Sequence, residues 1–158
     1  MREVRRTVQA PADMGNEVIS LPEGSDVDLD LRMESVLEGV LVTGVLTGRA
    51  VGECARCLDE VEQDVKVSFT ELYAYPDRES GEEDDVRELQ DELIDLEPAL
   101  RDAVVPALPF RPLCREDCPG LCPQCGARLA DEPDHAHEQL DPRWQALAGL
   151  LDQPGSEN

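Results

Sequence analysis

Polar and apolar residues alternate along several stretches in the first half of the chain. Every second residue of 26–34 is apolar, and 61–69 repeats this pattern and extends toward residue 75. A period of two is typical of a strand with one buried face. Residues 38–48 are β-branched and apolar but interrupted by glycines, as at bulges or bends of a curved sheet. With a shorter strand at 17–21, the sequence predicts four or five antiparallel strands.

Helical spacing replaces this alternation in the second half. Residues 96–105 carry Pro98 in a first turn and place four apolar side chains on one face: Leu96, Leu100, Ala103 and Val104. A second helix is predicted at 141–151, where Asp-Pro provides an N-cap and a first position. We therefore predict an α+β fold with a small curved antiparallel sheet or half-barrel, one central helix, a C-terminal zinc-knuckle segment and a short terminal helix.

The chain of 158 residues is expected to form one domain with extensions. Its predicted parts are an antiparallel β portion (1–75), an acidic loop (76–92), a helix packing on the sheet (93–110), a cysteine cluster (111–130) and a linker with an amphipathic helix (131–158). Residues 77–85 contain no apolar side chain, which is typical of a solvated loop. An interaction tail for a basic partner is the alternative.

The cysteines have the spacing of a metal site. Four of the six lie between residues 114 and 125, and a Cys-x-x-Cys pair lies far upstream. A Cys-x-x-Cys turn presents two sulfurs with little strain, and zinc accepts four in a tetrahedron. Pro123 stiffens the last such turn, and Gly126 permits the backbone to aim amide hydrogens at the sulfurs. We predict about one zinc ion, held by residues from the set Cys54, Cys57, Cys114, Cys118, Cys122 and Cys125.

Two sets of ligands compete for this ion. The local set is Cys114, Cys118, Cys122 and Cys125. The split set joins the two Cys-x-x-Cys pairs, Cys54 with Cys57 and Cys122 with Cys125. All six cysteines near one metal, with two as spares, is a third arrangement. His135 and His137 are weaker ligand candidates, and the favoured interpretation is that they are exposed linker residues. An iron site or a thiol redox switch is the chemical alternative to zinc.

The net charge of −22 restricts the class of partner. Nucleic-acid affinity depends on cations that neutralise phosphates, and aromatic residues make up only 3% of the chain. The only basic cluster is Arg2, Arg5 and Arg6. The charge therefore favours basic proteins as partners and argues against DNA and direct RNA binding. Enhanced solubility alone is the simpler reading of the same charge.

The sequence also predicts a location in the cell. No apolar run approaches the roughly 20 residues of a membrane span, and residues 1–6 lack the apolar core of an export signal. We expect a cytoplasmic protein that has no contact with a membrane. Thiols stay reduced there, which favours metal binding over disulfides.

Several motifs occur in an order that resembles a known family. They are residues 38–41, 52–58, the helix at 96 with Leu108-Pro109 after it, 114–126 and 141–144. Together they are similar to the bacterial YceD-like family of large ribosomal RNA subunit accumulation proteins, in an actinobacterial form with a C-terminal cysteine cluster. The resemblance implies a role in making or stabilising 23S ribosomal RNA. It provides no catalytic residue.

These observations lead to one main hypothesis and two alternatives. We expect a non-enzymatic factor that binds a basic protein of the large ribosomal subunit and affects rRNA indirectly. The alternatives are a direct RNA-binding or processing factor, and a thiol-redox or zinc-responsive regulator. A redox Cys-x-x-Cys normally opens a helix after a strand. Cys54 and Cys57 are instead predicted at a turn between the two central antiparallel strands, which argues against an oxidoreductase.

Overall fold

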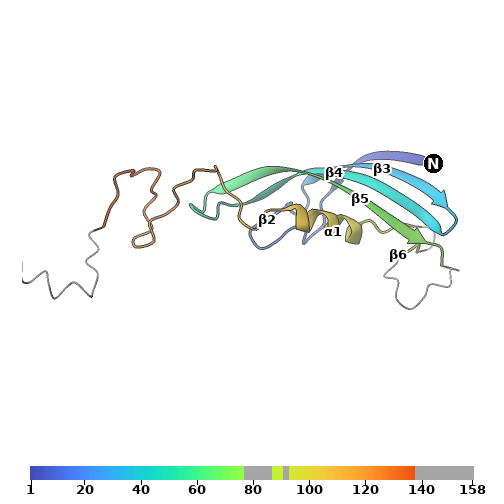
Figure 1. The fold of residues 1–158 in the computed structure, drawn as a ribbon. Coiled ribbons are helices and arrows are strands. Elements are labelled where there is room, and N and C mark those ends of the chain that lie inside the picture. The colour runs from blue at the N-terminus through green and yellow to red at the C-terminus, as the bar shows by residue number, and fades with distance from the viewer. Residues whose placement is uncertain (77–86, 91–92, 138–158) are drawn as a thin grey trace, which may run out of the picture.

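A long curved sheet with one helix against its concave face makes up most of the fold (Figure 1). The computed structural model describes residues 1–76, 87–90 and 93–137. The elements, in chain order, are β1 (Arg2–Gln9), β2 (Ile19–Ser20), β3 (Asp26–Val36), β4 (Gly39–Glu53), β5 (Glu60–Ala74), β6 (Arg87–Glu88) and α1 (Glu97–Ala107). The predicted α+β class is confirmed. The helix predicted at 141–151 and most of the acidic loop lie outside the described residues.

The sheet has the order β1-β3-β4-β5-β6, and β2 pairs with β4 beside this path. All pairings are antiparallel except that of β5 with β6, which is parallel. The alternation in 26–34 is confirmed, because Val27, Leu29 and Leu31 of β3 are buried while the aspartates between them are exposed. The hairpin of β4 and β5 is longer than predicted and ends close to Cys54.

Strand β1 is absent from the prediction because its sequence is almost entirely polar. It carries two apolar residues, Val4 and Val8, which pack against the edge of the core. Its eight residues pair with β3 from Arg2↔Met33 to Gln9↔Asp26. A strand at the edge of a sheet can be this polar because one of its sides and much of its surface stay in water.

The glycines of β4 make room for side chains rather than for bulges. The β4–β5 register is unbroken from Gly39↔Ala74 to Glu53↔Glu60, so of the predicted bulges or bends the bulges are absent from this pairing, while the sheet is curved as expected. A Cβ atom at Gly44 would lie 2.5 Å from the ring of Phe69, and one at Gly48 would lie 2.6 Å from Leu21 Cδ2. These two positions therefore let bulky neighbours cross the inner face of the sheet.

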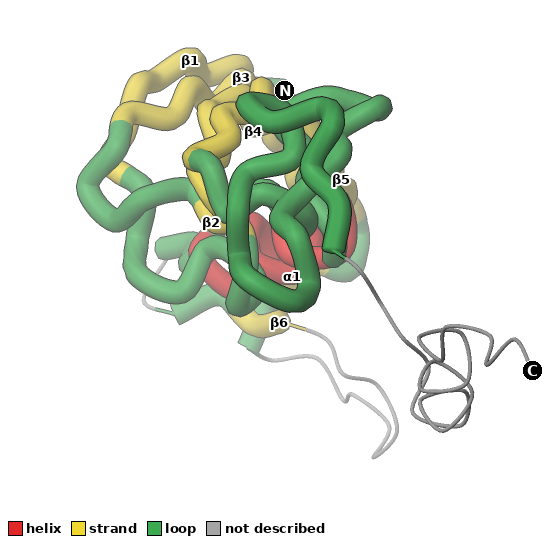
Figure 2. Tube along the Cα trace, turned by 90° about the vertical axis from the view of Figure 1, so that its left-hand side faces the viewer, coloured by secondary structure: helices red, strands yellow, loops and turns green. Residues whose placement is uncertain are grey.

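The core lies between the sheet and α1, which form two layers in the end-on view (Figure 2). The helix begins near the predicted residue, and Pro106 lies within its last turn. Its buried side chains are Ala99, Leu100 and Val104. They belong to one buried cluster with aliphatic residues of β3, β4 and β5 and with Phe69 and Tyr73, and the helix packs mainly against β5.

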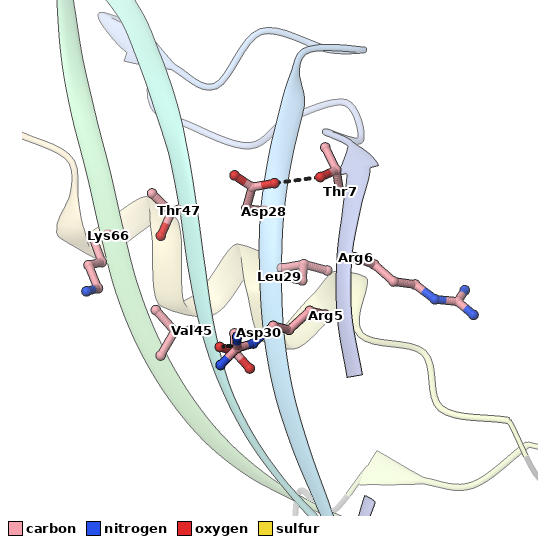
Figure 3. Close-up of a pocket in the computed structure, with 9 residues that line it drawn as sticks. All are labelled: Arg5, Arg6, Thr7, Asp28, Leu29, Asp30, Val45, Thr47 and Lys66. Atoms are coloured by element: carbon pink, nitrogen blue, oxygen red, sulfur yellow. Dashed lines mark hydrogen bonds and ion pairs between the residues drawn. The ribbon is translucent and has the colours of Figure 1, made fainter. Parts of the chain in front are cut away.

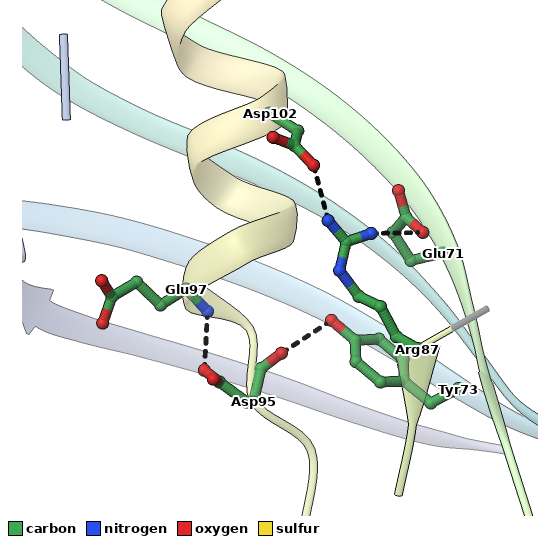
Figure 4. Close-up of polar contacts among 6 residues, drawn as sticks. All are labelled: Glu71, Tyr73, Arg87, Asp95, Glu97 and Asp102. Carbon is green, nitrogen blue, oxygen red and sulfur yellow. Dashed lines mark hydrogen bonds and ion pairs between the residues drawn. The ribbon is translucent and has the colours of Figure 1, made fainter. Parts of the chain in front are cut away.

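Polar contacts join α1 to the end of the sheet where β5 finishes (Figure 4). Arg87 of β6 contacts Glu71 at 3.0 Å and Asp102 of α1 at 2.5 Å. The hydroxyl of Tyr73 donates to the carbonyl of Asp95 at 2.9 Å. Arg87 lies in the segment 76–92 predicted as loop, so the chain pairs with the sheet before that segment ends.

Candidate metal centres

The first group of potential ligands joins two segments at the opposite end of the sheet, where β4 turns into β5. Cys54 and Cys57 come from this turn, as predicted, and Cys114 and Cys118 come from the segment after α1. Their four Sγ atoms all lie within 4.8 Å of one another. We call these residues the four-cysteine group.

The sulfur distances in this group match metal coordination. Cys54 Sγ lies 3.9 Å from Cys118 Sγ, and Cys57 Sγ lies 3.6 Å from Cys114 Sγ. Zn–S bonds of about 2.3 Å in a tetrahedron place sulfurs about 3.8 Å apart. A disulfide would need about 2.05 Å. These two distances therefore fit sulfurs that could share one metal ion and not sulfurs joined in a disulfide.

The β4–β5 turn orients its two cysteines through its backbone. The amide of Leu58 donates to the carbonyl of Cys54 at 2.9 Å, and the amide of Cys54 donates to the carbonyl of Asp59 at 2.7 Å. Leu58 has φ +63°, which is uncommon for a residue with a side chain. This conformation reverses the chain directly after Cys57 and leaves both sulfurs on one side.

Backbone contacts hold the second segment against this turn. Ala55 donates to the carbonyl of Pro112 at 2.8 Å, and Leu121 donates to the carbonyl of Arg56 at 3.0 Å. The Arg56 side chain donates to the carbonyl of Cys118 at 2.9 Å. Gly120, with φ +81°, allows this approach, since a Cβ atom there would lie 3.0 Å from the Arg56 carbonyl oxygen.

The second group lies within one segment and consists of Cys122, Cys125, His135 and His137. Its four ligand atoms also lie within 4.8 Å of one another. Cys125 Sγ is 3.2 Å from His135 Nε2, and the two histidine Nε2 atoms are 2.9 Å apart. We call these residues the Cys2His2 group.

The cysteine half of this group has the backbone of a tight knuckle. Gly126 donates to the carbonyl of Cys122 at 2.8 Å, and Cys122 donates to the carbonyl of Ala127 at the same distance. Gly126 has φ +75°, a conformation that suits glycine, in agreement with the role predicted for it.

The structure divides the potential ligands differently from both predicted sets. All six cysteines predicted as ligands lie in the two groups, but neither the local set nor the split set comes together as four. The interpretation of His135 and His137 as exposed linker residues agrees with the structure for His137 but not for His135. His135 is only 16% exposed and lies against Cys125. Glu132, which contacts His135 Nδ1 at 2.8 Å, is absent from the prediction.

Each group contains one thiol that ionises easily. A backbone hydrogen bond involving Cys114 is the main cause that lowers the pKa of Cys54 to about 6. The backbone amides of Cys125 and Gln124 lower the pKa of Cys122 to about 6. The thiolate is the form that binds metals. Both groups therefore present at least one ready ligand at neutral pH.

The pKa of Cys57 moves in the opposite direction, to about 12. A backbone hydrogen bond involving Asp59 lowers it, but burial and the neighbouring cysteine side chains outweigh that effect. Crowded sulfurs cannot all ionise without a cation between them. Such crowding is what a bound dication relieves.

A shallow pocket on the outer face of the sheet is a weaker candidate site (Figure 3). It lies over β1, β3, β4 and β5, and its lining includes Arg5, Asp30, Thr7, Asp28 and Lys66. Arg5 is paired with Asp30 at 2.9 Å, and Thr7 donates to Asp28 at 2.6 Å. These two pairs occupy most of the polar groups of the lining, and we assign the pocket no chemistry.

Among the residues that the structure describes, no helix is both long and apolar enough to cross a membrane.

Comparison with known proteins identifies the family. The family model for the large ribosomal RNA subunit accumulation protein YceD matches residues 42–151, a range that includes both ligand groups. The chain belongs to the YceD family. The resemblance predicted from the ordered motifs is thus confirmed, and membership supports a ribosome-related role.

Relatives extend across most of the chain. Uncharacterized protein Rv2926c of Mycobacterium tuberculosis is 56% identical over 154 residues, which are 96% of this chain and 74% of the relative. Uncharacterized protein ML1660 of Mycobacterium leprae is 45% identical over 151 residues, 94% of this chain and 70% of the relative. YlbN of Bacillus subtilis is 31% identical over 111 residues, 68% and 64% respectively. No solved structure matches the chain.

Proposed function

We propose that this protein is a non-enzymatic factor that supports the synthesis, processing or stability of 23S ribosomal RNA and the assembly of the large ribosomal subunit. It would do so by binding a basic ribosomal protein. The observation that carries the proposal is the match of residues 42–151 to a family described by the accumulation of large-subunit ribosomal RNA.

The charge of the chain supports a protein partner. A net charge of −22 attracts basic proteins and repels the phosphates of RNA. Ribosomal RNA would then accumulate indirectly, because its protein partner is delivered in a usable form. Residues 77–85, with six carboxylates, are the densest acidic segment available for this contact.

Contacts on the outer face of the sheet weaken the alternative of direct RNA binding. The guanidinium groups of three arginines lie against carboxylates: Arg5 with Asp30, Arg32 with Glu34, and Arg49 with Glu62 and Asp64. Their nitrogen–oxygen distances run from 2.9 to 3.5 Å. A guanidinium already paired with a carboxylate contributes little to neutralising a phosphate.

Zinc in the four-cysteine group would have a structural role rather than a catalytic one. Four protein sulfurs complete a tetrahedron and leave no open position for water or substrate, which is the arrangement of structural zinc sites. The ion would fix the β4–β5 turn to the segment that follows α1.

A pull-down from the protein's own cells tests the partner. The tagged full chain is recovered at low salt, and half of the sample is treated with RNase. We expect basic large-subunit proteins to remain after RNase and to dissociate as salt screens the charges. Loss of every partner with RNase, or recovery of 23S RNA alone, would contradict the proposal.

Two sets of substitutions sharpen this test. Neutralising the acidic segment with Glu82→Gln, Glu83→Gln, Asp84→Asn and Asp85→Asn should weaken capture of the basic partner. The opposite control, Arg2→Gln with Arg6→Gln, removes positive charge and should leave capture intact. Weaker capture in the arginine variant alone would favour RNA as the partner.

A further inference from the structure

We propose that Cys122, Cys125, His135 and His137 form a second zinc site, separate from the four-cysteine group, so that the chain binds two ions rather than one. The inference does not depend on the ribosomal role. It rests on the positions of these four side chains and on the contacts around them.

The ligand types fit zinc, and the four ligand atoms lie close enough together to share one ion. Two thiolates and two imidazoles are a common tetrahedral donor set for structural zinc, with bonds of about 2.3 and 2.0–2.1 Å. Ligand atoms in such a tetrahedron lie roughly 3.3–3.8 Å apart. All four atoms here fall within 4.8 Å of one another. The distances from His135 Nε2 to Cys125 Sγ (3.2 Å) and to His137 Nε2 (2.9 Å) are slightly shorter than the tetrahedral values, so a bound ion would move these side chains slightly apart.

The carboxylate of Glu132 supplies the supporting contact that a metal-bound histidine usually has. Its Oε2 atom lies 2.8 Å from His135 Nδ1. Ligating histidines commonly donate their other ring N–H to a carboxylate, which fixes the tautomer and orients the ring. With its proton on Nδ1, His135 turns the lone pair of Nε2 toward Cys125 and His137.

The surrounding backbone holds the site in place without a helix or a long strand. A bridge between Leu121 and Arg128 closes the knuckle that carries both cysteines. The amide of His135 donates to the carbonyl of Glu132 at 3.0 Å, which turns the chain back toward the knuckle. A segment with so little regular structure gains its order from a cross-link, and a zinc ion provides one.

The two groups cannot share a single ion. Each already supplies four ligand atoms, which complete a zinc tetrahedron. Their charges also differ, because four thiolates and Zn²⁺ sum to −2 whereas two thiolates, two neutral imidazoles and Zn²⁺ sum to zero. The second ion would order its segment without adding charge to an already acidic chain.

Metal stoichiometry of the reduced full-length protein, equilibrated with zinc and then freed of excess, tests the proposal. We expect two zinc ions per chain. His135→Asn with His137→Asn should retain one. The matched pair Cys114→Ser with Cys118→Ser should also retain one, because it disables only the four-cysteine group. One ion in the unmodified protein, still present in the histidine variant, would overturn the proposal.

Cobalt substitution identifies which ligands hold each ion. The histidine variant should give the absorption of a site with four sulfurs, and the Cys114/Cys118 variant that of a site with two sulfurs and two nitrogens. His135→Cys should keep both ions and shift the second spectrum toward three sulfurs. Two ions with an unchanged spectrum in the histidine variant would exclude His135 and His137 as ligands and overturn the proposal.

Discussion

The two ends of β5 are stabilised in different ways. At its last residues, Tyr73 and the helix side chains Leu100 and Val104 belong to a large aliphatic core. At its first residues, the buried cluster is small, and three of its four members are cysteines, with Val61 as the fourth. Small clusters bury too little apolar surface to order a segment alone, and proteins supplement them with disulfides or metals. An apolar core therefore stabilises one end of β5, whereas the other end has four sulfurs close enough to share one metal ion.

The largest expected effect is that of metal removal, which should destabilise the cysteine end of β5 and leave the core end intact. Chelation under reducing conditions should abolish amide-exchange protection at Leu58 and Leu121, because structural zinc contributes apparent binding free energies of about 10–16 kcal/mol in zinc-finger peptides. Amides of Leu46 and Val67 should stay protected. Hydrogen exchange measures the protection of both ends in one experiment. Added zinc should restore the protection at Leu58 and Leu121. Equal loss of amide protection at both ends would show that the two ends are not stabilised in different ways.

Truncating the core should give the opposite result. Leu46 is fully buried, so Leu46→Ala should lower the free energy of unfolding by about 2–5 kcal/mol. Urea unfolding measures this loss, and the metal content of the folded variant should not change. The control Leu37→Ala, at a side chain 98% exposed, should stay within about 0.5 kcal/mol. Metal loss in folded Leu46→Ala protein would show that the ends are coupled.

Overpacking the inner face tests the close fit between β4 and β5. Gly44→Ala should cost about 1–3 kcal/mol, because the new Cβ would lie 2.5 Å from the Phe69 ring. Adding Phe69→Leu should recover part of the loss, which thermal unfolding of the single and double variants can measure. If the double variant is no more stable than Gly44→Ala, a contact other than the Phe69 ring prevents a side chain at position 44.

The smallest expected effect is at the hydroxyl of Tyr73. Tyr73→Phe removes its hydrogen bond to Asp95 and should cost about 1 kcal/mol. Burial raises the pKa of Tyr73 above its ordinary 10.0. Its contribution to stability is therefore complete below about pH 10 and is lost as pH rises through the folded-state pKa. Unfolding curves at increasing alkaline pH should show this loss in the unmodified protein and less of it in the variant.

The periodicity of the sequence predicted the elements whose two faces differ most in polarity. The alternation of β3 and the apolar stripe of α1 were visible because each buries one side, and the turn carrying Cys54 and Cys57 followed from the strands around it. Strand β1 was missed because an edge strand with two apolar residues has no such contrast. β6 is two residues long and is defined only by its pairing with β5.

The division of the metal ligands could not be read from spacing. Cys-x-x-Cys identifies pairs, but only the fold decides which pairs meet. Cys57 and Cys114 come together because the helix returns the chain to the β4–β5 turn. The histidines, two residues apart in an acidic linker, were only weak candidates by spacing. The turn of the chain at Glu132 is what brings them to Cys122 and Cys125.

The contact between Cys57 and Cys114 has a consequence for the order in which the protein assembles. Between these residues lie all of β5, the acidic segment and α1. An ion shared by the four sulfurs would link two segments that are 57 residues apart, so its coordination would be complete only when the segment after α1 has returned to the β4–β5 turn. A bound ion would cross-link the two ends of the segment from Cys57 to Cys114. A protease cut within 77–86 would then leave two fragments that remain joined as one particle.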